Sequence, residues 1–452
     1  MNKRTARLRN EPTARLIARL SIPAISSLLI NATYNVADSI IVGRFVGTEG
    51  LAAVGLNFPV NIFLLAIGIL IGTGGAALVG RRLGAEDPEG ANRAFGSSLA
   101  MVMTIGVSVT LLGLALNGPI VRGLGASGNL FPMAREYFLI AVLGSTFVAA
   151  NHALNNFAYA EGAGSVGFIG LALSSTLNIV LDYLFVAVFS MGVGGAALAT
   201  VISQGAAAIF LLGYFFLPAS VLRPNICFCR DDIGEVSRVG FSASVRTLSV
   251  VLLGLVVNRQ ALLAAGDLGI AVASVVFRSI TIVLLPAIGV NQAFLPVAAY
   301  NYGARQYNRM ISAAWQSVVY ALVICFTASF FVIAYAEGLA RVFNPDPEFV
   351  RTAAEGFRVA FRLTPLIIFN LVGSGLFQAV GDARRSLLIA ASRMGFFFLP
   401  LMLILPGYMG LPGIWLSFLL GELASALFAG LITWPKLREL GEAARRREAV
   451  PA

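Results

Sequence analysis

Long apolar runs dominate this chain of 452 residues and limit the folds that it can adopt. Hydrophobic residues make up 58% of the chain and charged residues only 12%, whereas a soluble domain carries about 45–50% and about 25%. Many runs reach about 20 residues, the length at which a helix spans the hydrocarbon core of a bilayer. The runs at 197–217 and 386–405 lack the alternation of barrel strands. The sequence therefore predicts an all-α integral membrane protein.

Proline, glycine and charged residues divide the apolar sequence into twelve predicted spans. We place them at 20–42, 54–80, 96–116, 134–158, 166–189, 194–217, 239–264, 270–299, 312–335, 352–379, 387–406 and 411–433. The predicted domain order is an N-terminal tail at 1–19, an N-lobe at 20–217, a linker at 218–238, a C-lobe at 239–433 and a C-terminal tail at 434–452. We expect no cleaved signal peptide, because the first apolar run is too long for one.

Basic residues test this arrangement, since cytoplasmic loops of membrane proteins are enriched in lysine and arginine. With the N-terminus in the cytoplasm, the cytoplasmic segments hold 21 of the 32 lysine and arginine residues, and the outer loops hold 5. One missed or extra span would invert this bias in the rest of the chain. We therefore predict an even number of spans and cytoplasmic N- and C-terminal tails.

The chain also repeats itself at an offset of about 219 residues, so that Glu136 and Phe138 fall on Glu355 and Phe357. The register holds over six spans, and an even number of spans gives both halves the same orientation. The predicted architecture is two parallel six-helix lobes with a pseudo-two-fold axis along the membrane normal. Two such lobes permit alternating access to a site near the middle of the membrane.

Polar side chains inside spans are costly in lipid and are therefore candidates for function. Asp38 lies in span one, and Asn31, Tyr34 and Asn35 precede it by one or two turns on the same helical face. The alternative for Asp38 is a solvated residue near the outer end of its helix.

Spans five and six carry a second polar set. Asp182 follows Asn178 by four residues in span five, and Thr200 lies in span six. Two carboxylates that face one cavity do not both ionise cheaply, so they would share a proton or a cation. The amide and hydroxyl oxygens would serve as neutral ligands for Na⁺, which makes Na⁺ a possible metal at Asp38, Asn178, Asp182 and Thr200.

The repeat supports a specialised role for this set. At the same offset Asp38 falls on Val257 and Asp182 falls on Leu401, so the acidic set occurs in one half only. A purely structural role would be expected in both halves, whereas a coupling ion needs only one.

The spans of the second half carry arginines instead. They are Arg246, Arg259, Arg278, Arg358, Arg362 and Arg393, with Glu422 in the last span. The alternatives are arginines that extend to the membrane surface from span ends and ion pairs with Glu422 or backbone carbonyls. Arg278 and Arg393 are the best candidates for a C-lobe cavity, where they would favour anionic groups on a cargo.

Two other residues of the first half bear on mechanism. Pro23 would kink span one about four turns before Asp38, which suggests either a hinge or a tolerated packing defect. His152, the one histidine, could relay protons, but we favour a buried and satisfied side chain. We expect the three cysteines to be unpaired thiols.

The ordered set of these features resembles the multidrug and toxic compound extrusion (MATE) family over about residues 14–435. The motifs are Ala37-Asp38-Ser-Ile-Ile-Val-Gly43-Arg44 at the end of span one, Gly68-Ile-Leu-Ile-Gly72-Thr73 followed by Leu83-Gly84-Ala85, and Asn301-Tyr302-Gly303-Ala304 in the other half. The resemblance implies export of organic cations and other amphiphiles from a bacterial or archaeal plasma membrane, by antiport with Na⁺ or H⁺ and without a further cofactor.

Within that family, the chain is most similar to the subgroup named for the DNA-damage-inducible protein F. The resemblance implies a coupling-cation site at Asp38, Asn178, Asp182 and Thr200, with Tyr34 and Pro23 at associated positions of span one. The C-lobe arginines depart from what a cation exporter needs, which leaves the charge of the cargo open.

Three other functions compete with this interpretation. A flippase for a lipid-linked or anionic precursor, from the same superfamily, would suit the arginines. The absence of a catalytic motif disfavours a membrane enzyme. A gated channel is disfavoured because the acidic residues occur in one half of the repeat only, which suits alternating access better than a continuous pore. We expect a monomer that binds small amphiphilic substrates and membrane lipid, and no nucleic acid.

Overall fold

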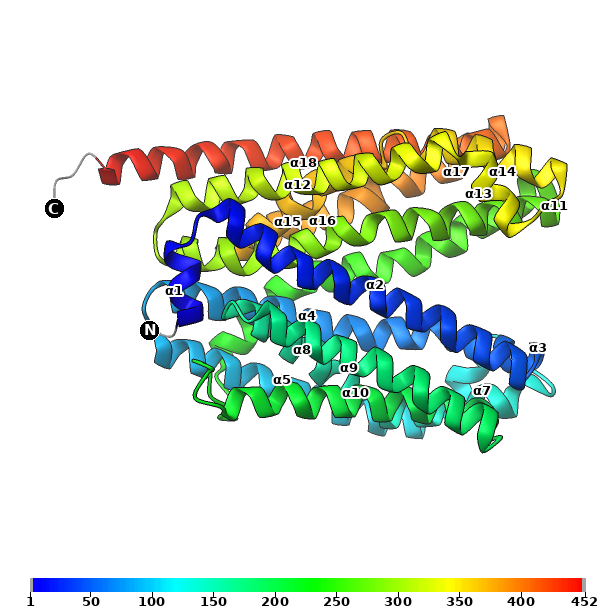
Figure 1. Ribbon diagram of the computed structural model, residues 1–452, viewed down its shortest axis with the longest axis horizontal. Helices are drawn as coiled ribbons and strands as arrows, with labels where there is room; N and C mark the ends of the chain where they lie inside the picture. The colour runs from blue at the N-terminus through cyan, green and yellow to red at the C-terminus, as the bar shows by residue number, and fades with distance from the viewer. Residues whose placement is uncertain (1–2, 449–452) are drawn as a thin grey trace. The chain divides into compact units, whose positions relative to one another are not determined.

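A computed structural model describes residues 3–448, and this part of the chain contains helices and no strand (Figure 1). The predicted all-α membrane fold is confirmed. The ends of both predicted terminal tails lie outside the described residues.

The helices group into two compact units. The first unit contains Ser26–Ser244 together with α1. Its elements are α1 (Lys3–Asn10), the later part of α2 (Thr13–Phe45), α3 (Thr48–Leu56), α4 (Phe58–Gly84), α5 (Pro88–Ala115), α6 (Asn117–Gly123), α7 (Leu130–Leu143), α8 (Ser145–Ala160), α9 (Gly164–Asp182), the π-helix η1 (Tyr183–Val188), α10 (Gly192–Phe216) and the start of α11 (Arg230–Gly303).

The second unit contains Glu11–Ile25, from the start of α2, and the chain from Val245 onwards. After the remainder of α11 come α12 (Tyr307–Ala334), α13 (Ala336–Phe343), α14 (Pro347–Ala360), the 3₁₀ turn η2 (Thr364–Leu366), α15 (Ile367–Val380), α16 (Ala383–Ala391), the π-helix η3 (Ser392–Phe398), α17 (Leu399–Met409) and α18 (Leu411–Glu448).

The described residues contain twelve spans. Ten helices, some of them joined pairs, are long and apolar enough to cross a membrane, and α7 with α8 forms an eleventh span that bends by 50°. Helix α11 has 74 residues and would be about 110 Å long if straight, far more than one crossing of a core about 30 Å thick needs. Non-helical backbone at Ala265 and Gly266, where Gly266 has φ 59°, divides it into two. The predicted count of twelve therefore holds.

Two predicted spans are broken helices. Span four breaks at Gly144 between α7 and α8, and span ten breaks between Ala360 and Ile367. Pro365 lies in the second break and lacks the N–H that would continue a helix. A Cβ at Gly144 would lie 2.8 Å from Cγ1 of Val201, so glycine permits α10 to pack closely at the first break. The two breaks fall at equivalent places in the repeat.

The glycines of α4 pack against α8, as the interpretation of Gly72-Thr-Gly-Gly75 as a packing motif predicts. A Cβ at Gly72 would lie 3.0 Å from Cα of Ala153, and a Cβ at Gly75 would lie 2.8 Å from Cε1 of Phe157. Close approach of this kind is how membrane helices associate when lipid supplies no hydrophobic driving force. All three cysteines are free thiols, as predicted.

A buried carboxylate anchors the connection between α10 and α11. Glu161, in the turn after α8, is only 1% exposed. It accepts hydrogen bonds from Oγ of Ser220 at 3.0 Å, from the N–H groups of Val221 and Leu222 at 3.0 and 3.3 Å, and from the hydroxyl of Tyr214. Burial raises the pKa of the Glu161 carboxyl above its ordinary value, although the four donors act in the opposite direction.

We expect Glu161 to give the protein a pH-dependent stability. Because its pKa is raised in the folded state, its contribution is complete below about pH 4.5, its ordinary pKa, and is lost as the pH rises through the folded-state value. The melting temperature of the wild type minus that of Glu161→Gln should fall as the pH rises from 4 to 8. A difference that is constant over this range would contradict the assignment.

Candidate coupling site

The candidate site of the first unit begins at the last turns of α9. Asp182 is 0% exposed and Asn178 is 2% exposed. The four-residue spacing places both side chains on the same face of α9. Directly after Asp182 the backbone changes to the π-helix η1, a local irregularity that is frequent at functional sites.

Asn178 joins Asp182 to Thr200 of α10. With its amide nitrogen toward Asp182, Asn178 donates to Oδ2 of that carboxylate at 2.9 Å. Its oxygen then accepts from the hydroxyl of Thr200 at 3.2 Å and from the Thr200 N–H at 3.3 Å. This orientation is assigned from the hydrogen-bond network. It leaves each polar atom of the Asn178 amide facing a suitable partner.

Asp38 of α2 completes the set. Its half-buried carboxyl group lies within hydrogen-bond reach of the Asp182 carboxyl. Oδ1 of Asp182 is buried and has no hydrogen-bond partner among the residues that the structure describes. Two carboxyl groups this close need a proton or a cation between them, because both cannot carry a full charge at low cost. The structure thus brings together all four residues that the sequence singled out.

The neighbours of Asp38 on α2 form part of the same surroundings. Tyr34 is close enough to both carboxyl groups to interact with them electrostatically. The Asn35 amide donates to the backbone oxygen of Asn31 at 2.7 Å. Asn31 and Asn35 therefore bond along their own helix, and Tyr34 is the member of this face that reaches the acidic pair.

Two further residues of the site were missed from the sequence. Tyr137 of α7 is 5% exposed and interacts electrostatically with Asp38 and Asp182. Its hydroxyl accepts a hydrogen bond from the Asn61 amide of α4 at 3.2 Å. The repeat contains a signal for Tyr137. Its neighbours Glu136 and Phe138 recur in the second half, but the residue between them there is Gly356, so the tyrosine is specific to the first half.

The oxygen donors of this site suit a hard cation. The described residues include no group of three or more histidine, cysteine, aspartate and glutamate side chains that could hold a metal ion. The available ligands are two carboxylates, an amide and a hydroxyl. Oxygen ligands of this kind suit a hard cation, and the unpartnered oxygen of Asp182 offers it a place.

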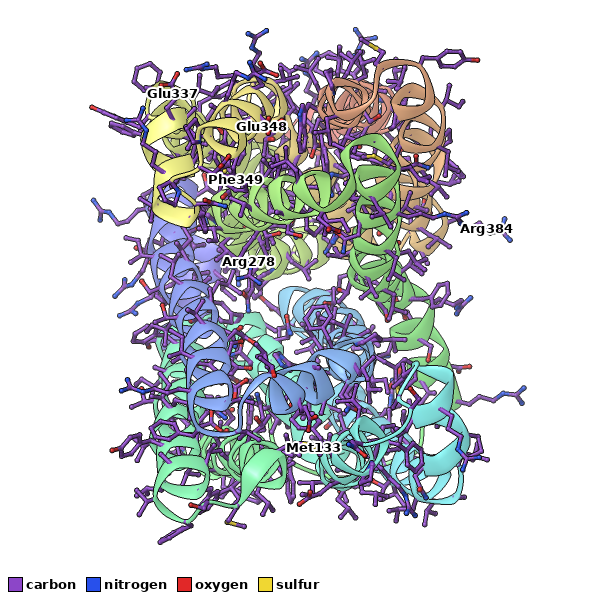
Figure 2. The ribbon with its side chains drawn as sticks, turned by 90° about the vertical axis from the view of Figure 1, so that its right-hand side faces the viewer. Met133, Arg278, Glu337, Glu348, Phe349 and Arg384 are labelled. Atoms are coloured by element: carbon purple, nitrogen blue, oxygen red, sulfur yellow. The ribbon has the colours of Figure 1, made fainter. Side chains whose placement is uncertain are left out.

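The other predicted residues lie elsewhere. Arg278 of α11 is exposed (Figure 2). Arg393 lies in η3 and forms an ion pair with Glu422, with 2.5 Å between Nη2 and Oε1, which is one of the alternatives considered for the arginines. Helix α2 continues through Pro23. His152 is half-buried on α8.

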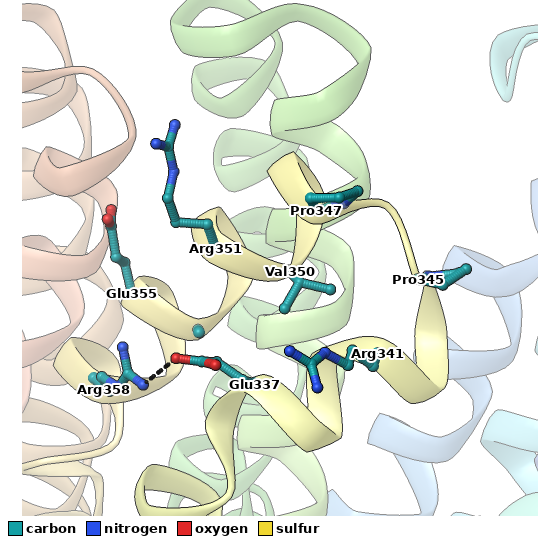
Figure 3. Close-up of a pocket in the computed structure, with 9 residues that line it drawn as sticks. Glu337, Arg341, Pro345, Pro347, Val350, Arg351, Glu355 and Arg358 are labelled. Atoms are coloured by element: carbon teal, nitrogen blue, oxygen red, sulfur yellow. Dashed lines mark hydrogen bonds and ion pairs between the residues drawn. The ribbon is translucent and has the colours of Figure 1, made fainter.

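A separate surface pocket of about 520 Å³ lies between α13 and α14 (Figure 3). Its charged lining residues are Glu337, Arg341, Arg351, Glu355 and Arg358. Among the described residues, Arg358 pairs with Glu337 at 2.8 Å. None of the residues of the candidate coupling site lines this pocket.

Comparison with known proteins identifies the family. The sequence model of the MatE family matches residues 23–184 and again residues 243–404. The chain belongs to the MatE family. The second match begins 220 residues after the first, which agrees with the internal repeat at about 219. Membership of MatE also confirms the expected class, a membrane transporter and not an enzyme.

Relatives of MatE type match almost the full chain. The multidrug export protein MepA of Staphylococcus aureus (strain MSSA476) is 29% identical over 431 residues, which cover 94% of each chain. MepA of Staphylococcus saprophyticus is 28% identical over 92% of each chain.

Solved MATE structures share the fold. A MATE in complex with MaL6 has a TM-score of 0.93 at 27% identity and covers 98% of this chain and 100% of that one. An outward-facing multidrug resistance MATE transporter has a TM-score of 0.93 at 28% identity. That match covers 98% of this chain and 99% of the other. A transporter of Pyrococcus furiosus has a TM-score of 0.92 at 27% identity, and the match covers 98% of this chain and 99% of the other. That transporter is described as having a binding pocket of reverse polarity.

Proposed function

We propose that this protein is a multidrug exporter that antiports amphiphilic organic compounds, mainly cations, against H⁺ or Na⁺ by alternating access. The observation that carries the proposal is the close pair of carboxyl groups at the half-buried Asp38 and the buried Asp182, with one oxygen of Asp182 unpartnered among the described residues. Its relatives MepA are multidrug export proteins, which supports the same class of cargo. We place it in a bacterial or archaeal plasma membrane with both terminal tails in the cytoplasm.

The proposed mechanism uses the acidic pair as a switch. When the site faces outward, H⁺ or Na⁺ binds between Asp38 and Asp182 and neutralises their repulsion. The bound ion lowers the charge of the pair from −2 to −1, so the pair attracts a cationic cargo less strongly and the cargo leaves. Ion and cargo thus each favour one of two states, so that binding of one weakens binding of the other.

Tyr34 and Tyr137 extend the effect of the ion beyond the acidic pair. Both lie close enough to the carboxyl groups to sense their charge. Tyr34 lies on α2 and Tyr137 on α7, so neutralisation changes the forces on two different helices. We infer that α2 moves on ion binding, with Pro23 as its hinge. Straight and bent conformations are described for a MATE of the same fold.

Thr200→Val distinguishes the two ions. Valine keeps the shape of threonine and removes the hydroxyl that bonds Asn178. If Na⁺ is the coupling ion, loss of one oxygen ligand should raise the Na⁺ concentration for half-maximal transport roughly fivefold, the size of one hydrogen bond. If H⁺ is the coupling ion, the pH profile should change little. The measurement is dye transport by proteoliposomes over a range of Na⁺ concentrations and of pH. A loss of transport that neither ion can restore would contradict both forms of the mechanism.

A further inference from the structure

We propose that the second unit contains an anion-accepting subsite formed by Arg246 and Arg393, on the helices that correspond to those of the coupling site. This goes beyond the proposed function, because it assigns a binding chemistry to the other half of the repeat. Its ligand is an anionic group such as a carboxylate, sulfonate or phosphate.

The repeat relates the two sites helix by helix. The coupling site is built from spans one, five and six, and its counterparts are spans seven, eleven and twelve, which carry Arg246, Arg393 and Glu422. At the offset of the repeat, Arg246 falls on Ser27 and Arg393 falls on Ser174. Those serines are buried and uncharged in the first unit, so the shared fold does not require arginine at these positions.

The equivalent positions also share helical faces with the coupling residues. Ser174 lies four residues before Asn178 and eight before Asp182, which is one face of α9. Ser27 lies eleven residues before Asp38, three turns away on the same face of α2. The arginines of the second unit therefore occupy the faces that the coupling site uses in the first.

Arg393 is already half of an ion pair. Its Nη2 atom lies 2.5 Å from Oε1 of Glu422, and its Nε lies 3.1 and 3.2 Å from the two carboxylate oxygens. The side chains are 8% and 2% exposed, and the guanidinium also lies over the ring of Phe398 at 4.9 Å. Both carboxylate oxygens of Glu422 thus contact Arg393.

Arg246 is the charge that remains. The residue is half-buried, but its Nη1 atom is buried and has no hydrogen-bond partner among the described residues, and it lies close enough to Arg393 for the two guanidinium groups to repel. A buried charge is normally paired, because an unpaired one loses its hydration without compensation. Two guanidinium groups and one carboxylate leave one positive charge, which one anionic group would balance.

The local backbone is irregular in both units. Arg393 lies within the π-helix η3, just as Asp182 directly precedes η1. The extra residue in a π-turn alters the direction of the side chains that follow, and such turns are frequent at functional sites. An Arg fork then suits a carboxylate or phosphate group, since it can donate two parallel hydrogen bonds.

Two dyes that differ in one carboxylate test the subsite. Rhodamine 110 carries a free carboxylate, and rhodamine 123 is its methyl ester. We expect Arg246→Gln to weaken binding of rhodamine 110 to the purified protein about tenfold or more, with rhodamine 123 changed less than about twofold. Fluorescence anisotropy in a low-salt buffer that contains no carboxylate counter-ion measures both affinities. The matched control is Arg259→Gln, an exposed arginine on the same helix, which should change neither.

Added chloride identifies the source of the anion. If chloride weakens rhodamine 110 binding to the wild type but not to Arg246→Gln, the subsite also takes a free inorganic anion. If chloride has no effect, the subsite is filled by the anionic group of the cargo. An equal affinity of the wild type and Arg246→Gln for rhodamine 110 overturns the proposal.

A structural role for Arg246 gives a different result. The glutamine variant removes a charge whose Nη1 atom is buried without a partner among the described residues, so its melting temperature without added anion should not fall. A lower melting temperature together with equal loss of both dyes would assign Arg246 to folding and overturn the subsite. Arg246→Lys, which keeps the charge and loses the fork, should bind rhodamine 110 with intermediate affinity. Since no ion gradient is involved, the result stands whether or not the exporter mechanism does.

Discussion

Asp182→Asn is expected to abolish ion-driven export while leaving the protein folded. Asparagine keeps the shape of the side chain at the end of α9, but it removes one of the two charges that a proton or Na⁺ neutralises. An ion shifts the equilibrium between two states only by its differential affinity for them, so the export rate should fall by roughly 100-fold. The readout is the initial rate at which dye-loaded cells lose a fluorescent organic cation.

Asp231→Asn is the control for this change. Asp231 is an exposed carboxylate of the same unit, in the first turn of α11, and its replacement should leave export unchanged. Equal melting temperatures of the two purified variants would show that folding is preserved. Full export by Asp182→Asn would remove the acidic pair from the mechanism.

Glu422→Leu is expected to destabilise the second unit strongly. The change removes the carboxylate that pairs with Arg393 among the described residues and leaves the buried Arg393 near the half-buried Arg246 without a counter-charge from Glu422. Breaking a buried ion pair from one side costs about 3–5 kcal/mol, so the melting temperature should fall sharply. Thermal unfolding of the purified protein, followed by tryptophan fluorescence, measures this.

The double variant Arg393→Met with Glu422→Leu tests the reason for that loss. Removing both charges leaves no unpaired member of the pair, and hydrophobic replacement of a buried pair is often neutral. We expect the double variant to recover most of the lost stability. A double variant as unstable as Glu422→Leu would mean that leucine at this position disturbs packing, and that the ion pair is not the cause.

The spans were predictable because membrane insertion imposes a simple rule on the sequence. Long apolar runs and flanking arginines gave twelve spans, and the division of α11 at Gly266 falls between two of them. The breaks within spans four and ten were not predictable in this way, because Gly144 and Pro365 lie inside apolar runs that hydropathy does not divide. Helix α18 continues to Glu448, well beyond its apolar part, because a helix in water needs no apolar run.

The residues of the candidate site were predictable from the sequence, but the contacts between them were not. Asp38, Asn178, Asp182 and Thr200 stand out because charged and amide groups are rare in lipid. Tyr137 does not stand out, since an aromatic side chain is ordinary in a span. The role of Asn178 as the bridge between α9 and α10 depends on distances that no sequence pattern contains.

The most direct test of ion-coupled export is uptake of a fluorescent organic cation into inside-out proteoliposomes at zero membrane potential. An imposed Na⁺ gradient is compared with an imposed pH gradient, for the wild type and for Asp182→Asn. We predict that one of the two gradients drives uptake by the wild type and that neither drives uptake by the variant. Uptake by the wild type that is the same with and without either gradient would contradict the coupling of export to an ion at the acidic pair.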